Sequence, residues 1–158
     1  MDAIALRRLR GGERSAVLEV FAGLSERSRR LRFLGAKPRL NERDLETLVD
    51  VGCCGREAVV ALEQETGRPI GIARYVRDTD APEAEIAFEV VDDWHGRGVG
   101  RRLAAELAGL ARSHGILRLR ANVDRGNAAA LAVVHGLGDV LASRPDGSAV
   151  ELVIRLED

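Results

Sequence analysis

The sequence predicts an α/β (α+β) fold in which helices flank a mixed, mostly antiparallel central sheet. Short segments alternate apolar and charged residues, as half-buried strands do. Three of them, residues 57–63, 70–77 and 84–91, are separated only by turns, which predicts an antiparallel meander. A strongly amphipathic stretch at residues 98–113 then predicts a long helix directly after the third strand.

A strand and three helices are expected before the meander. Residues 3–10 alternate as a strand, and residues 13–24 carry apolar side chains at helical spacing. Residues 25–33 predict a short helix capped by its first serine. Its four arginines are interpreted as a solvated face, with contact to an acidic partner as the alternative. Residues 42–49 predict a third helix, capped by Asn41.

The long helix is followed by a strand, a helix and a closing hairpin. Residues 116–123 alternate as a strand, and the alanine-rich residues 127–135 predict a helix. Residues 140–144 and 149–156 flank a Pro-Asp-Gly turn and predict a hairpin. The expected order is therefore β-α-α-α-β-β-β-α-β-α-β-β.

Composition indicates one globular domain spanning residues 1–158, with 46% hydrophobic and 31% charged residues. A net charge of −1 gives no general attraction to nucleic acid or to an anionic membrane. No secretion signal and no membrane-spanning apolar run are visible, so a cytoplasmic location is expected. The adjacent Cys53 and Cys54 are interpreted as ordinary thiols in a reducing compartment.

A glycine-dense loop precedes the long helix and predicts an anion-binding site. Gly96, Gly98 and Gly100 leave backbone amides unshielded where the helix dipole is positive. The loop lacks the Gly-Lys-Ser/Thr of a nucleotide-hydrolase phosphate loop. A dinucleotide fingerprint is excluded as well, because the glycine spacing differs and the loop follows an antiparallel meander.

The loop at residues 95–100, HGRGVG, resembles the Arg/Gln-x-x-Gly-x-Gly/Ala signature of the GNAT acetyltransferase superfamily. Downstream, Asn127 stands before Leu137-Gly138 at the distance of that superfamily's second cofactor segment, although Asp139 replaces the usual phenylalanine. The element order also matches over essentially the whole chain. The resemblance implies the GNAT fold, in which two central strands splay apart.

Three stretches, residues 24–40, 73–90 and 92–103, resemble the acetyltransferase domain of bacterial Pat-type protein-lysine acetyltransferases. The implied acyl donor is acetyl-CoA, with its pyrophosphate on the loop amides and its pantetheine arm along the preceding strand. The residues expected to bind it are Val90, Val91, His95, Gly96, Arg97, Gly98, Val99, Gly100, Arg101 and Asn127.

Transfer to an amine requires a base, because a lysine with a pKa of about 10.4 is almost fully protonated near pH 7. Glu85 matches the position of the catalytic glutamate in the Pat-type domain and is the expected general base. Glu89 shares its strand face and is the reserve candidate. Val134 stands where many superfamily members place a tyrosine acid, and His95 stands where the motif has Arg or Gln.

The expected activity is acetyl-CoA-dependent transfer to a primary amine, with a protein lysine as the implied acceptor. A small amine is one alternative acceptor, and a non-catalytic acyl-CoA sensor is a second class of function. The histidines and cysteines show no metal-ligand spacing, so no metal is expected. Neither nucleic acid nor membrane is expected as a partner, and the pattern is compatible with a homodimer.

Overall fold

The structure is a computed structural model that describes residues 3–53, 55–79 and 81–156. Its strands and helices follow the predicted order, with one additional 3-10 turn. The elements are β1 (Ile4–Arg8), α1 (Arg14–Ala22), α2 (Glu26–Phe33), α3 (Glu42–Leu48), β2 (Arg56–Glu63), β3 (Pro69–Arg77), β4 (Glu83–Val90), η1 (Asp92–Trp94), α4 (Val99–Ser113), β5 (Arg118–Asp124), α5 (Ala128–His135), β6 (Val140–Asp146) and β7 (Ala149–Arg155).

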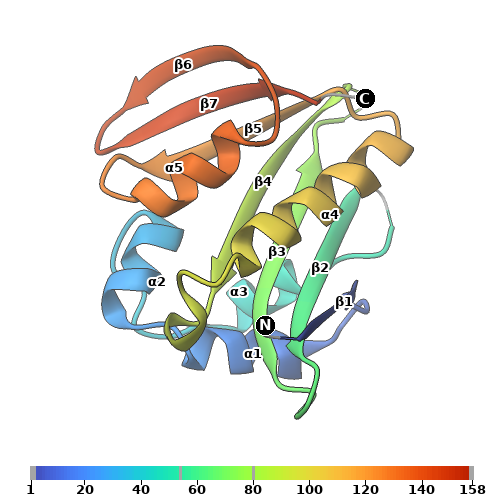
Figure 1. Ribbon diagram of the computed structural model, residues 1–158, viewed down its shortest axis with the longest axis vertical. Helices are drawn as coiled ribbons and strands as arrows, with labels where there is room; N and C mark the ends of the chain where they lie inside the picture. Colours follow the sequence, from blue (N-terminus) through green and yellow to red (C-terminus); the bar gives the residue numbers. More distant parts are fainter. Residues whose placement is uncertain (1–2, 54, 80, 157–158) are drawn as a thin grey trace.

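The seven strands form one sheet in the order β1-β2-β3-β4-β5-β7-β6 (Figure 1). Every neighbouring pair is antiparallel except β4 and β5, which are parallel because α4 crosses over between them. The predicted mixed, mostly antiparallel sheet is confirmed. No helix in the described ranges is long and apolar enough to cross a bilayer.

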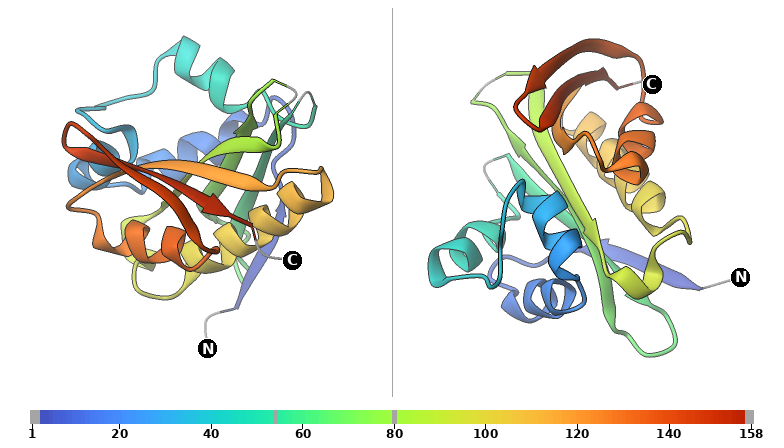
Figure 2. Two further views of the ribbon diagram at one scale, coloured as in Figure 1. Left: turned by 90° about the horizontal axis from the view of Figure 1, so that it is seen from above. Right: turned by 90° about the vertical axis from the view of Figure 1, so that its left-hand side faces the viewer.

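Helices cover both faces of the sheet (Figure 2). The helices α1, α2 and α3 lie on one face, where α1 contacts β3 and α2 contacts β4 and β5. The helices α4 and α5 lie on the other face. Side chains of each strand therefore alternate between an α1–α3 face and an α4–α5 face.

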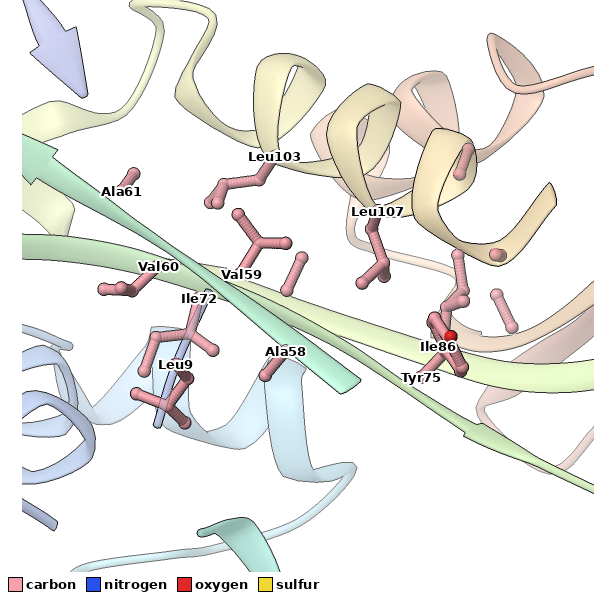
Figure 3. Packing of buried hydrophobic residues seen from close by; sticks show 14 of the residues in the cluster. Leu9, Ala58, Val59, Val60, Ala61, Ile72, Tyr75, Ile86, Leu103 and Leu107 are labelled. Carbon is pink, nitrogen blue, oxygen red and sulfur yellow. The ribbon is translucent and has the colours of Figure 1, made fainter. Parts of the chain in front are cut away.

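The core fills both spaces between sheet and helices (Figure 3). Leu103 and Leu107 point from α4 toward Val59 of β2, which confirms the predicted apolar stripe of the long helix. Gly71 of β3 allows α4 to come this close, because a Cβ there would stand 2.9 Å from Cδ1 of Leu103. This close packing holds the start of α4 against the middle of the sheet.

The two short helices before the meander begin at the predicted caps. The Ser25 hydroxyl accepts a hydrogen bond from the Ser28 amide at 3.1 Å. Asn41 and Asp44 form a reciprocal capping box, with bonds of 2.8 and 2.9 Å. Each cap satisfies amides that a helix start otherwise leaves without partners.

The expectation of a solvated arginine face on α2 is wrong for two of its four arginines. Arg29 donates to the backbone carbonyls of Phe21 and Pro38. The Nε of Arg32 donates to the buried carboxylate of Glu89 at 2.6 Å, and Arg74 of β3 reaches the same carboxylate at 3.4 Å. The bonds of Arg32 and Arg74 to Glu89 join residues distant in the sequence, so no local pattern reveals them.

The Arg32–Glu89–Arg74 cluster holds α2 over the middle of the sheet. The Glu89 side chain is only 7% exposed, and those of Arg32 and Arg74 are 14% and 9% exposed. Burial alone would raise the pKa of Glu89, but the two guanidinium groups outweigh it and lower that pKa below its ordinary value. The carboxylate therefore stays charged and bridges helix to strand.

We predict that Glu89→Gln destabilises the fold strongly, because it leaves two buried cations without their anion. The expected loss in the free energy of unfolding is about 3–5 kcal/mol, measured by urea denaturation. The control is Glu26→Gln, which breaks the exposed Arg30–Glu26 pair of α2 and should cost less than about 1 kcal/mol. Similar losses in the two variants would contradict the assigned role of Glu89.

The same cluster predicts a pH dependence with a defined sign. Because the pKa of Glu89 is lowered in the folded state, its stabilisation is complete above its ordinary pKa of 4.5 and disappears as the pH falls below it. The difference in free energy of unfolding between wild type and Glu89→Gln should therefore become smaller with acidification below pH 4.5. A difference that stays constant or grows in this range would exclude a charged Glu89 as its cause.

Candidate active site

The loop after β4 leads into α4, whose first turn has no side-chain cap. The cap residue of α4 is Gly98, whose φ of +79° favours glycine and which has no side chain to bond the first amides. A Cβ at Gly96 or Gly98 would meet nothing within 4 Å, so the space beside both residues is open. The amides of Val99, Gly100 and Arg101 thus begin a 15-residue helix with no side-chain cap.

Positive charge surrounds this helix start. The first turn contains no acidic residue, and Arg101 and Arg102 are both exposed there. The guanidinium of Arg97 lies 4.5 Å from the ring centroid of Trp94, so it is held beside the loop. Cations at a helix N-terminus oppose the dipole, and an anionic ligand removes that cost. The residues present therefore fit a diphosphate group.

His95 closes the loop onto the end of β4. Its Nε2 lies 2.8 Å from the carbonyl oxygen of Val90, and a carbonyl only accepts, so Nε2 carries the proton and donates it. The expectation that His95 replaces the Arg or Gln of the motif as a donor has this geometric support. Its bond goes to the strand, so it fixes the glycine loop against the end of β4.

The strands β4 and β5 separate directly below this loop. They are paired from Glu83 and Arg118 to Ile86 and Ala121, and the ladder ends there although both strands continue. The predicted splayed pair is therefore confirmed. Beyond Ile86, the backbone amides of β4 that point toward β5 have no strand to pair with and are available to an inserted extended group.

Backbone groups of β4 alternate in direction along the strand. This alternation decides which of them face the opening between β4 and β5, called the gap below. The Val91 amide donates to the Ile70 carbonyl at 2.9 Å, so odd-numbered residues of the strand bond β3. Even-numbered residues, Phe88 and Val90, direct their amides toward the gap. Of the expected pair, Val90 faces the gap, whereas Val91 bonds β3 and is fully buried. Phe88 is not among the residues predicted to bind the acyl donor, because the sequence alone does not give the pairing register of β4.

The far wall of the gap contains the start of α5. Asn127 caps that helix, and its Oδ1 accepts from the Ala130 amide at 3.1 Å. Its side-chain nitrogen is not used in the cap and is left to donate. Val133 of α5 and Val90 of β4 both come within 4 Å of a Cβ placed on Gly100, so α5 and β4 approach each other at this glycine.

The α1–α3 face of the gap is charged. The Glu85 carboxylate is 51% exposed and lies 3.3 Å from a guanidinium nitrogen of Arg120 on β5. Arg120 also binds Asp78 and Glu83 at 2.9 Å, and the carboxylates of Asp78 and Glu85 raise its pKa. Glu85 is thus accessible and held at the point where the strands part. Glu89, the reserve candidate, is instead occupied by Arg32 and Arg74.

Comparison with known proteins identifies the family. The profile of the Acetyltransferase (GNAT) family matches residues 17–138. The chain belongs to the GNAT family of acetyltransferases. It is 30% identical over 147 residues to Acetyltransferase PA5475 of Pseudomonas aeruginosa, covering 92% of this chain and 79% of that relative.

Two further GNAT proteins are Pat-type. Acetyltransferase Pat of Mycolicibacterium smegmatis is 37% identical over 97 residues, which are 61% of this chain but only 29% of that relative. The crystal structure of the GNAT domain of S. lividans PAT superposes with a TM-score of 0.85 at 25% identity, covering 98% of this chain and 97% of that one. The predicted family resemblance is confirmed.

This GNAT protein is therefore an acetyl-CoA-dependent N-acetyltransferase, since the family uses acetyl-CoA as acyl donor. Val134, where many GNAT enzymes place a tyrosine, is fully buried in the core. No cluster of three or more metal-ligating side chains occurs among the described residues. A cavity of about 770 Å³ lies at the opposite end of α4, beside Tyr75 and His114.

We predict that His95→Ala weakens binding of CoA about five- to tenfold, because the loop loses its bond to Val90. His95→Gln keeps an N–H donor and should stay within about threefold of wild type. The measurement is the CoA dissociation constant by titration calorimetry. His135→Ala, at the exposed end of α5, is the control and should leave it unchanged. Unaltered affinity in His95→Ala would show that the bond does not shape the loop.

Proposed function

We propose that this protein transfers the acetyl group of acetyl-CoA to a primary amine, with Glu85 as general base and a protein lysine as the acceptor. The observation that carries the proposal is the accessible carboxylate of Glu85 at the point where β4 and β5 part. The lysine acceptor rests on the sequence resemblance to Pat-type domains.

The loop and the gap bind different parts of acetyl-CoA. Amides at the start of α4 hold the pyrophosphate, and the amides of Phe88 and Val90 hold the extended pantetheine arm. Asn127 donates to the same arm from the far wall. These contacts bring the thioester to the gap, where the amine approaches from the α1–α3 face.

Glu85 removes the proton that prevents attack. Near pH 7 only about one lysine in 10³ is neutral, so a base beside the amine raises the reactive fraction. The amine nitrogen bonds to the acetyl carbon, the carbon–sulfur bond breaks, the nitrogen releases its second proton to solvent, and the thiolate takes a proton from solvent. Val134 offers no acid at the position where many GNAT enzymes have a tyrosine, and a thiol pKa of about 8.5 makes protonation from solvent easy.

We predict that Glu85→Gln lowers kcat/KM about 10²- to 10⁴-fold while the CoA dissociation constant stays the same. The glutamine retains a hydrogen-bond partner for Arg120, so the local structure is kept. The remaining rate should increase with pH, because deprotonation in solution then replaces the base. Thiol release from acetyl-CoA is measured with lysine peptides and small amines from pH 6 to 10.

The matched control is Glu83→Gln, because Glu83 binds the same Arg120 but lies two residues further from the end of the β4–β5 pairing than Glu85. It should change kcat/KM less than about threefold. Equal rates for wild type and Glu85→Gln would remove Glu85 from the mechanism. Activity confined to small amines would exclude a protein lysine as the acceptor, and no thiol release with any amine would overturn the proposed activity.

A further inference from the structure

One arginine of β5, Arg120, binds three carboxylates close to the point where β4 and β5 part. Its two terminal nitrogens contact Asp78, Glu83 and Glu85. Asp78 directly follows β3, whereas Glu83 and Glu85 lie on β4, so the guanidinium joins β5 to both neighbouring segments. Like charges repel, and the guanidinium between the three carboxylates offsets that repulsion.

Asp78 and Glu83 fix the position of this guanidinium. The Asp78 carboxylate accepts from Nη1 at 2.9 Å and from Nη2 at 3.2 Å, which is the two-bond geometry that suits a planar guanidinium. Glu83 accepts from Nη1 at 2.9 Å. The hydrogen bonds from Arg120 lower the pKa of Asp78, so this carboxylate stays charged at neutral pH. Arg120 is therefore held independently of Glu85.

Glu85 is bound to the fixed guanidinium through one oxygen only. Nη2 of Arg120 donates to Oε2 of Glu85 at 3.3 Å, and Oε1 accepts no hydrogen bond from any residue in the described ranges. The side chain of Glu85 is half-exposed, so an incoming amine has access to this carboxylate. A glutamate on an exposed strand face would otherwise sample many rotamers, and the bond to Arg120 restricts them.

We propose that Arg120 is a positioning residue for the acetyl transfer: it holds Oε2 of Glu85, so that Oε1 takes the proton of the amine at the gap. This inference rests on the proposed role of Glu85 as general base. A displacement of about 1 Å in a reacting group can cost about 10²-fold in rate, so loss of this anchor should lower kcat. Arg120 lies on the α1–α3 face and α4 on the other, so CoA binding should not depend on it.

A purely structural role of Arg120 is the alternative, and a double-mutant cycle separates the two roles. If Arg120 acts through Glu85, replacing it has no further effect on the rate once Glu85 is changed to glutamine, because the base is already absent. If Arg120 only joins the strands, its replacement lowers the rate by the same factor in both backgrounds.

The experiment measures kcat and the CoA dissociation constant for Arg120→Met and Arg120→Lys, each with and without Glu85→Gln. Thiol release is followed at a single pH with the lysine peptide or small amine that the wild type uses best. We expect kcat to fall about tenfold or more in Arg120→Met and about two- to fivefold in Arg120→Lys, which keeps a cationic donor. In the Glu85→Gln background, neither should change the rate more than about twofold. CoA binding should stay at the wild-type value.

The matched control is Arg118→Met, which removes the same charge from the same face of β5. Arg118 lies two residues before Arg120, and its Nε reaches Glu83 at 3.5 Å. Its loss therefore leaves the bond between Arg120 and Glu85 in place, and kcat should stay within about threefold of wild type. Thermal unfolding is measured for every variant. If Arg120→Met does not fold, the cycle with Arg120→Lys decides.

The outcomes separate this inference from the proposed function. Equal losses of kcat with and without Glu85→Gln, or wild-type kcat in Arg120→Met, overturn the positioning role and leave the proposed function intact. A loss in Arg118→Met equal to that in Arg120→Met overturns it as well, because charge alone then explains the effect. So does weaker CoA binding in Arg120→Met. Equal rates for wild type and Glu85→Gln, or a wild type without thiol release, instead remove the proposed function on which the inference rests.

Discussion

The separation of β4 from β5 is the constraint on which the rest of the site depends. The two strands pair only as far as Ile86 and Ala121, and each continues without the other. A sheet that stayed closed would bury the backbone groups of Phe88 and Val90 in its own ladder. The open end instead exposes them beside an uncapped helix start, so one gap offers both an anion site and an extended-chain site.

Charge is distributed unequally around this gap. On the α4 side, the uncapped amides and exposed arginines favour an anion. On the α1–α3 face, Glu85 is accessible, while Glu89 is enclosed by Arg32 and Arg74. Two carboxylates on one strand face thus have different roles: the exposed one has the access that a base needs, and the buried one holds α2 in place over the gap.

Much of the fold and part of the site could be predicted from the chain. Periodicity located the strands and helices, and the caps at Ser25 and Asn41 are local hydrogen bonds between near neighbours. The glycine loop could be recognised in the sequence, because glycine destabilises a helix and is therefore expected there only where the backbone conformation or a close ligand requires it. Simple alternation placed Glu85 and Glu89 on one face of their strand, opposite to Phe88 and Val90, and in the structure Glu89 contacts α2 while Phe88 and Val90 face α4.

What sequence alone determined here is local: element order, helix caps, the bare helix start and the faces of β4. Only the tertiary structure decided the contacts that depend on register and on distant partners. It showed that Val91 bonds Ile70 while Phe88 faces the gap, and that Arg32 and Arg74 enclose Glu89. It also placed Arg120 between Asp78 and Glu85. Such pairings follow from how strands align across the sheet, a relation that periodicity within a single strand does not contain.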